Sequence, residues 1–263
     1  MNDVFKHYGI EHLSPSSINT YIKSPARWII RYLYKKQLPG SPAMWRGNVV
    51  DKAVGYYFGM MPNQKSKRSL TKVQTDALDQ FDYLRRDDKA NGFETDQDKF
   101  DKEKELIPDY IATAIDHYKD CGDPIEYQEK VLYEVKGIPV PLVGFLDLKY
   151  KDVVRDLKTA QRKPNDITYA IRRQVALYGH VTGCRPIVDY VVCTKHKSEV
   201  HSYEVDNVKG HLKVLEQGAY AIQSLLSTSD TIEDIAKLVM PDFDDWMLSD
   251  AERDIAMSLW RIK

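Results

Sequence analysis

The first half of the chain has apolar residues at helical spacing. Between residues 14 and 35 they form one face, which contains Ile18, Tyr21, Ile22, Trp28, Ile29 and Leu33. Ser14 or Ser16 can cap the start of this helix, and Pro25 predicts a break into two shorter helices. The pattern predicts further helices over residues 45–60, 70–90 and 99–120.

The pattern changes near residue 127 to short runs rich in β-forming residues. It predicts strands over 127–135, 138–150, 153–160, 187–195 and 199–205, with a helix over 166–182 between the third and fourth. A helix over 207–227 and further helical segments complete the chain. The sequence therefore predicts an α/β fold, with a mixed central sheet of about five strands, flanking helices and an N-terminal helical region.

These elements divide the chain into three segments. Residues 1–125 form a mainly helical region, 126–228 an α/β core and 229–263 a C-terminal helical segment. A chain of 263 residues can bury a sizeable core, and we expect the three segments to make one compact domain.

Charge is segregated along the chain although the net charge is −1. Residues 1–52 carry eight Lys and Arg against three Asp and Glu, and residues 155–185 carry seven against two, so each segment has a charge of +5. Residues 76–129 carry seven against seventeen, which gives −10. Two basic segments that fold together would make a positive surface suited to nucleic acid, although such runs are usually solvated faces.

Several classes of protein are disfavoured by the sequence. No apolar run approaches the roughly 20 residues that cross a bilayer, and the N-terminus lacks a signal-peptide pattern. We therefore expect no membrane association and a cytoplasmic location, which for a viral protein would be the host cytoplasm. Three scattered cysteines, Cys121, Cys184 and Cys193, predict neither a disulfide framework nor a structural zinc site.

Candidate chemistry lies on two consecutive predicted strands. Asp147 ends an apolar strand, and Asp156 and Lys158 lie two residues apart on the next, so that both point to one face. A tight hairpin would bring Asp147 beside Asp156. Two carboxylates and one ammonium at such a point suit Mg²⁺ or Mn²⁺ and phosphodiester hydrolysis. The alternative is an ordinary hairpin with an Asp–Lys surface pair.

Four motifs in order resemble the RecB-like branch of the PD-(D/E)XK nucleases, which includes the RecB nuclease domain, the CRISPR-associated adaptation nucleases and, as relatives, phage recombination exonucleases. The first is the opening helix, residues 13–33, and the second is Arg46-Gly47 with Asp51. The third joins Gly144 and Asp147 to Asp156 and Lys158, and the fourth is Gln174 with Tyr178. The resemblance implies a core like that of restriction endonucleases.

The resemblance also implies roles for these residues. Asp51, Asp147, Asp156 and the carbonyl of Leu157 would bind Mg²⁺ or Mn²⁺, and Lys158 would be the catalytic lysine. Gln174 and Tyr178, one helical turn apart, would lie near the site, the alternative being a buried polar residue and a core tyrosine. Gly47, one turn before Asp51, is expected to let that helix face approach the sheet closely.

Two departures from the family pattern change its cofactors. Ser24 stands where many relatives have a cysteine, and no cysteine follows Cys193. An iron–sulfur cluster needs four thiolates and the chain has three cysteines, so we expect no cluster. Asp51 stands where relatives usually have a metal-binding histidine, and a carboxylate suits a hard cation better.

The resemblance implies a DNA exonuclease that acts on single- or double-stranded ends in recombination or repair, with phage origin plausible. Alternatives are a structure-specific or flap endonuclease, an RNA nuclease and a non-catalytic DNA-binding protein of the same fold. No P-loop motif is present, so unwinding would need a recombination partner. Candidate phosphate contacts are Arg27, Arg31, Arg46, Arg162, Lys163, Arg172 and Arg173.

Overall fold

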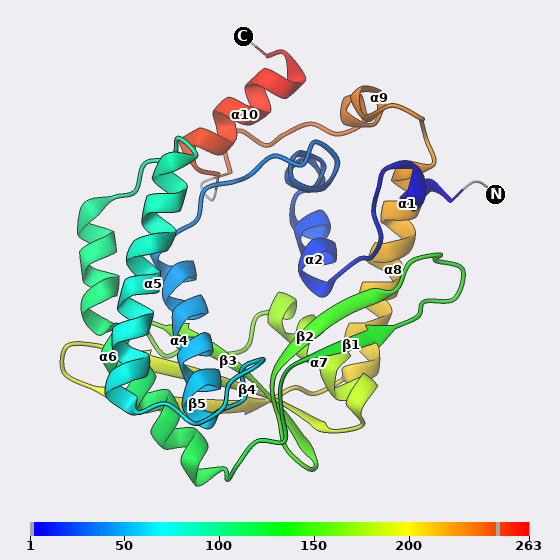
Figure 1. Ribbon diagram of the computed structural model, residues 1–263. Helices are drawn as coiled ribbons and strands as arrows, with labels where there is room; N and C mark the ends of the chain where they lie inside the picture. Colours follow the sequence, from blue (N-terminus) through cyan, green and yellow to red (C-terminus); the bar gives the residue numbers. More distant parts are fainter. Residues whose placement is uncertain (1–2, 246–247, 263) are drawn as a thin grey trace.

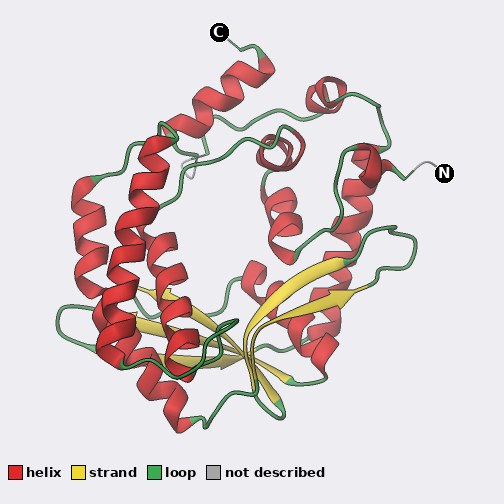
Figure 2. Cartoon of the chain, viewed as in Figure 1, coloured by secondary structure: helices red, strands yellow, loops and turns green. Residues whose placement is uncertain are grey.

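A mixed sheet of five strands forms the centre of the protein, of which a computed structural model describes residues 3–245 and 248–262. The strands lie in the order of the sequence: β1 (Glu126–Tyr133), β2 (Leu142–Lys149), β3 (Val153–Ala160), β4 (Arg185–Cys193) and β5 (Ser198–Glu204). The β3–β4 pair is parallel and the other pairs are antiparallel. The predicted α/β class with a five-stranded mixed sheet is therefore confirmed, and Figure 2 shows helices surrounding this sheet.

Helices cover both faces of the sheet (Figure 1). On one face, α4 (Pro42–Phe58), α5 (Leu70–Ala90) and α6 (Gln97–Asp120) share a hydrophobic core with Val191 and Cys193 of β4. On the other, α7 (Tyr169–Thr182) packs on Val188 and Val192 of the same strand. Alternate residues of a strand point to opposite faces, so β4, which is buried after its first residue, is covered on both sides.

The predicted break at Pro25 is confirmed in the N-terminal region. Helix α2 (Pro15–Lys23) ends before Pro25, and α3 (Pro25–Trp28) runs into a short π-helical turn, η1 (Ile29–Leu33). Ser24 serves both helices: its N–H bonds the carbonyl of Thr20 at the end of α2, and its hydroxyl accepts from the N–H of Arg27. The side-chain oxygen thus satisfies one of the free N–H groups at the start of α3.

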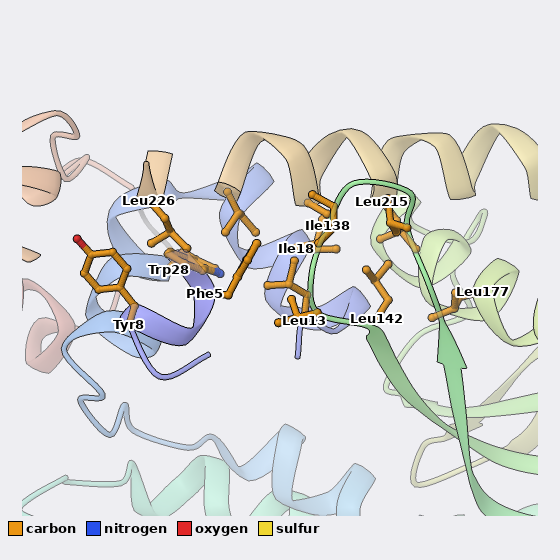
Figure 3. Packing of buried hydrophobic residues seen from close by; sticks show 14 of the residues in the cluster. Phe5, Tyr8, Leu13, Ile18, Trp28, Ile138, Leu142, Leu177, Leu215 and Leu226 are labelled. Carbon is orange, nitrogen blue, oxygen red and sulfur yellow. The ribbon is translucent and has the colours of Figure 1, made fainter. Parts of the chain in front are cut away.

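The N-terminal helices pack on α8 (Val208–Leu226) and on β2. Figure 3 shows this core, in which Ile18, Trp28 and Leu226 belong to the same cluster as Leu142 of β2 and Leu177 of α7. Short helices α1 (Val4–His7) and α9 (Ile232–Lys237) lie at its edge. Helix α10 (Asp250–Trp260) starts with the capping box of Ser249 and Glu252. Within the described ranges, no helix is both long and apolar enough to cross a bilayer.

The sheet opens between β2 and β3. Register pairs join Leu148 to Arg155 and Lys149 to Val154, next to the turn, whereas β1 and β2 pair from one end to the other except at Gln128 and Asp147. In Figure 1 the β1–β2 ribbon rises away from β3, β4 and β5. The strands therefore fork immediately beyond the hairpin, and the predicted site residues follow at this fork.

Candidate active site

Asp147 and Asp156 face each other across the fork between β2 and β3. The next register pair after Leu148 and Arg155 would be Asp147 with Asp156. In place of a ladder bond, Asp147 Oδ2 accepts the backbone N–H of Leu157 at 2.8 Å. The hairpin expected from the sequence thus brings the two carboxylates to one place, with a side chain holding the strands together where backbone pairing ends.

Lys158 lies beside Asp156 on β3. Its Nζ is 2.5 Å from Asp156 Oδ2, and Asp156 is fully buried. Asp156 Oδ2 is therefore paired with this ammonium, whereas Asp156 Oδ1 is buried and has no hydrogen-bond partner. A buried carboxylate oxygen without a partner is costly unless a donor or a cation compensates it. Asp156 Oδ1 is thus available to a second cation.

Helix α4 brings Asp51 to the same place. Asp51 Oδ2 accepts hydrogen bonds from Tyr127 Oη and from Gln128 Nε2, each at 3.0 Å, and Gln128 Nε2 also donates to Asp147 Oδ1 at 3.2 Å. The amide of Gln128 therefore joins the helix carboxylate to the strand carboxylate. Tyr127 and Gln128 carry no motif that the sequence analysis could have used.

The glycine that allows this close approach is Gly55, and the expectation for Gly47 was wrong. A Cβ added at Gly55 would lie 2.5 Å from the Tyr127 ring, far inside van der Waals contact. A Cβ at Gly47 would meet Thr159 Oγ1 at 3.6 Å, an ordinary contact. Helix α4 therefore docks on β1 through Gly55 and the ring of Tyr127.

Burial raises the pKa values of the three carboxyl groups, and repulsion within the cluster adds to the rise for Asp51 and Asp147. Burial is the largest cause for each, and it raises the pKa of Asp51 to about 6. The charges of Asp156 and Asp51 further raise the pKa of Asp147 well above its usual range. Lys158 opposes these shifts; although burial lowers its own pKa, Asp156 and Asp147 raise that pKa above the usual value. The cluster favours gaining positive charge, as a proton or as a metal ion.

Gln174 and Tyr178 share one face of α7, as their spacing predicts. Gln174 Nε2 donates to Tyr178 Oη at 2.9 Å, and Tyr178 is buried against β2. A Cβ at Gly144 would lie 2.5 Å from the Tyr178 ring, which explains the glycine three residues before Asp147. Tyr178 therefore packs beside the strand that carries Asp147.

Replacing Gly144 with alanine is expected to displace Tyr178 and to destabilise the fold by about 1–3 kcal/mol, the usual cost of an overpacked core. Cleavage of DNA should fall with it, because β2 carries Asp147. Chemical denaturation measures the first effect. The matched control is Gly47→Ala, which adds the same methyl group to helix α4, where it would make an ordinary van der Waals contact with Thr159. Equal stabilities of the two variants would contradict this account of Gly144.

The predicted phosphate contacts lie in different surroundings. Arg162 and Lys163 are exposed in the loop after β3, and exposed Arg31 lies over the ring of Tyr32. The other three are partly buried and have protein partners, which are Glu252 for Arg27, Asp166 and Asp206 for Arg172, and Asn19 for Arg173. Arg31, Arg162 and Lys163 are thus the members most accessible to a phosphate.

Arg46 does not reach the surface, which corrects the expectation that it contacts phosphate. It is 3% exposed and pairs with the buried carboxylate of Glu103 from α6. Its Nε donates to Thr159 Oγ1 at 3.1 Å and its Nη2 to the Thr159 carbonyl at 3.2 Å. The guanidinium therefore ties α4 to α6 and to the end of β3, directly after Lys158.

The side chains at the fork fit a hard divalent cation by their chemistry. The donors are carboxylate oxygens, which such ions prefer, and the buried Asp156 Oδ1 has no hydrogen-bond partner. As placed, no three His, Cys, Asp or Glu side chains of residues 3–245 and 248–262 form a ready cage. Asp51 and Asp147 instead share the amide of Gln128, so ion binding would replace that hydrogen-bond bridge.

Comparison with known proteins agrees with this fold. The chain resembles the crystal structure of a candidate exonuclease from Eubacterium rectale, with a TM-score of 0.54 and 16% identity over 93% of this chain and 88% of that one. SSO0001 covers 66% of this chain and 85% of its own at 10% identity, and its TM-score of 0.31 is too low to carry an argument. No curated protein matches. Residues 12–237 match the sequence model of the PD-(D/E)XK nuclease superfamily, so the chain belongs to that superfamily.

Proposed function

We propose that the protein is a deoxyribonuclease that uses Mg²⁺ or Mn²⁺ to hydrolyse phosphodiester bonds at DNA ends. The observation that carries this proposal is the meeting of Asp147, Asp156 and Lys158 at the fork, where Lys158 pairs with Asp156 Oδ2 and the buried Asp156 Oδ1 has no partner. Membership in a nuclease superfamily and the fold shared with a candidate exonuclease support it.

The residues of the fork divide the work of the reaction. Asp147, Asp156, Asp51 and the carbonyl of Leu157 would hold a divalent cation, which when bound polarises the phosphate and lowers the pKa of water. Lys158, 27% exposed, orients the attacking water and places a positive charge beside the phosphate oxygens as negative charge develops. Tyr178 supports β2 from the core, and Gln174 fixes its hydroxyl through a hydrogen bond.

End-labelled DNA tests the proposal. Single- and double-stranded oligonucleotides with 5′ or 3′ labels are incubated with the protein in Mg²⁺, in Mn²⁺ and in EDTA. Release of short labelled products from one end, with none in EDTA, is the expected result. Absence of cleavage under every metal condition, with DNA still bound, would favour the alternative of a non-catalytic DNA-binding protein.

The remaining alternatives have distinct substrates. An exonuclease must leave covalently closed circular DNA intact, whereas a structure-specific or flap endonuclease cuts at an internal junction. Labelled RNA of the same sequence separates a ribonuclease from a deoxyribonuclease. A cytoplasmic location, a role in recombination or repair with a partner protein, and the lack of an iron–sulfur cluster belong to the same proposal.

The variant Asp51→Asn is expected to raise the metal concentration for half-maximal cleavage several-fold, because a neutral amide oxygen binds a cation less well than a carboxylate. The change keeps the shape of the side chain, so the unfolding temperature in EDTA should not fall. Titration of Mn²⁺ against cleavage rate measures the effect. Superimposable titrations for the two proteins would place Asp51 outside the coordination shell.

A further inference from the structure

Two consecutive residues of β1 reach the same carboxylate oxygen. Tyr127 Oη and Gln128 Nε2 both donate to Asp51 Oδ2. In a regular strand, successive side chains point to opposite faces of the sheet. One of these two residues must therefore have an irregular backbone.

That residue is Gln128. Its φ is +52°, in the left-handed region that residues other than glycine, asparagine and aspartate seldom adopt. The register with β2 continues on both sides, Tyr127 with Leu148 and Glu129 with Leu146, so no residue has been inserted. Gln128 stands opposite Asp147 between these pairs, and the unusual backbone turns its side chain toward Asp51 and Asp147.

Strained backbone persists where the surroundings fix it, and it is concentrated at functional sites. Here the strain has an identifiable result, because the amide nitrogen lies within 3.2 Å of an oxygen from each of two carboxylates. The same two carboxylates would have to converge on a cation. The positive end of the amide dipole thus lies between two carboxylates whose mutual repulsion raises the pKa of Asp147.

We propose that Gln128 is a positioning residue of the metal site, whose amide holds Asp51 on α4 beside Asp147 on β2 before the ion binds. This inference rests on the metal-dependent function proposed above. It explains why a side chain with no motif signal adopts a strained conformation opposite Asp147.

Four purified full-length variants test the inference. Gln128→Ala removes the amide and keeps the strained backbone, and Gln128→Gly removes the amide and relieves the strain. Gln128→Glu keeps the length but replaces the N–H donor with a second oxygen. The control is Glu129→Ala, on the neighbouring residue, whose carboxylate pairs with Lys149. Calorimetry measures Mn²⁺ binding without DNA, and thermal unfolding is followed in EDTA and in Mn²⁺.

Loss of a residue that orients metal ligands typically weakens metal binding 10- to 100-fold. We expect about 10-fold weaker Mn²⁺ binding for Gln128→Ala and Gln128→Gly, with the glycine variant the more stable in EDTA. Gln128→Glu adds a carboxylate to three others, so its unfolding temperature should fall in EDTA and rise with Mn²⁺ by more than that of the unmodified protein. Glu129→Ala should bind Mn²⁺ normally.

The outcomes separate this inference from the proposed function. If the unmodified protein binds Mn²⁺ and both Gln128→Ala and Gln128→Gly bind it within twofold, the role of Gln128 is overturned and the metal site stands. Equal loss of stability in EDTA and in Mn²⁺, with unchanged affinity, would reduce Gln128 to a structural residue. An unmodified protein that binds no Mn²⁺ would overturn both proposals.

Discussion

Cleavage of end-labelled DNA by the variant Asp156→Asn is expected to fall by about 10³-fold or more. A bound metal contributes several kcal/mol of transition-state stabilisation, and each 1.36 kcal/mol corresponds to a factor of ten in rate. Asparagine keeps the shape of Asp156 but removes the charge, and with it both the attraction for a cation and the ion pair with Lys158. Rates in saturating Mn²⁺ measure the loss.

DNA affinity distinguishes a defect in chemistry from one in binding. The Asp156→Asn protein should bind DNA as tightly as the unmodified protein, because the buried carboxylate does not attract phosphate. Asp152→Asn, in the exposed turn between β2 and β3, is the matched control and should cleave normally. Near-normal cleavage by Asp156→Asn would refute the assignment of the site to this fork.

Replacing Arg46 with alanine is expected to lower the free energy of unfolding by about 3–5 kcal/mol, the usual cost of leaving one member of a buried ion pair without its partner. Glu103 would keep one hydrogen bond, from Gln161, but lose its charge partner in a position that is 6% exposed. Total stabilities of domains are about 5–15 kcal/mol, so the loss is large. Urea denaturation followed by circular dichroism measures it.

Arg31→Ala is expected to affect DNA binding and to leave stability unchanged, the opposite of Arg46→Ala. Arg31 is exposed on η1, so its removal should change stability by less than about 0.5 kcal/mol. It should weaken DNA binding and reduce the salt dependence of that binding, as expected for a phosphate contact. If Arg46→Ala instead kept the free energy of unfolding of the unmodified protein and lost DNA affinity, Arg46 would act as a phosphate contact.

The order and type of the elements were predictable because they depend on local patterns. Alternating and continuous apolar runs predicted the five strands, and helical periodicity with Ser14 and Pro25 predicted the broken N-terminal helix. The meeting of Asp147 with Asp156 followed from the short hairpin, since the three residues between β2 and β3 leave few other registers. These features are encoded within a few residues of where they appear.

Features that depend on tertiary packing were not predictable. The burial of Arg46 requires Glu103, which lies 57 residues away. Both are charged residues on helices, where charged side chains usually lie at the surface. The left-handed conformation of Gln128 has no sequence signal, because glutamine ordinarily avoids it. Gly47 and Gly55 lie on the same helix, and packing alone shows that Gly55 is the one against Tyr127. The division into three segments remains a prediction.

The fork in the sheet gives the site a mechanical property. Asp147 belongs to the β1–β2 ribbon and Asp156 to the three-stranded part, and these two bodies are joined by two register pairs beside the turn and by the hydrogen bond from the Leu157 N–H to Asp147 Oδ2. Rotating one body against the other about that turn would change the gap between the two carboxylates while leaving the pairing inside each body intact. The hydrogen bond that Tyr133, far along the ribbon, donates to Glu216 of α8 opposes such a rotation and therefore helps to fix the gap between the two carboxylates.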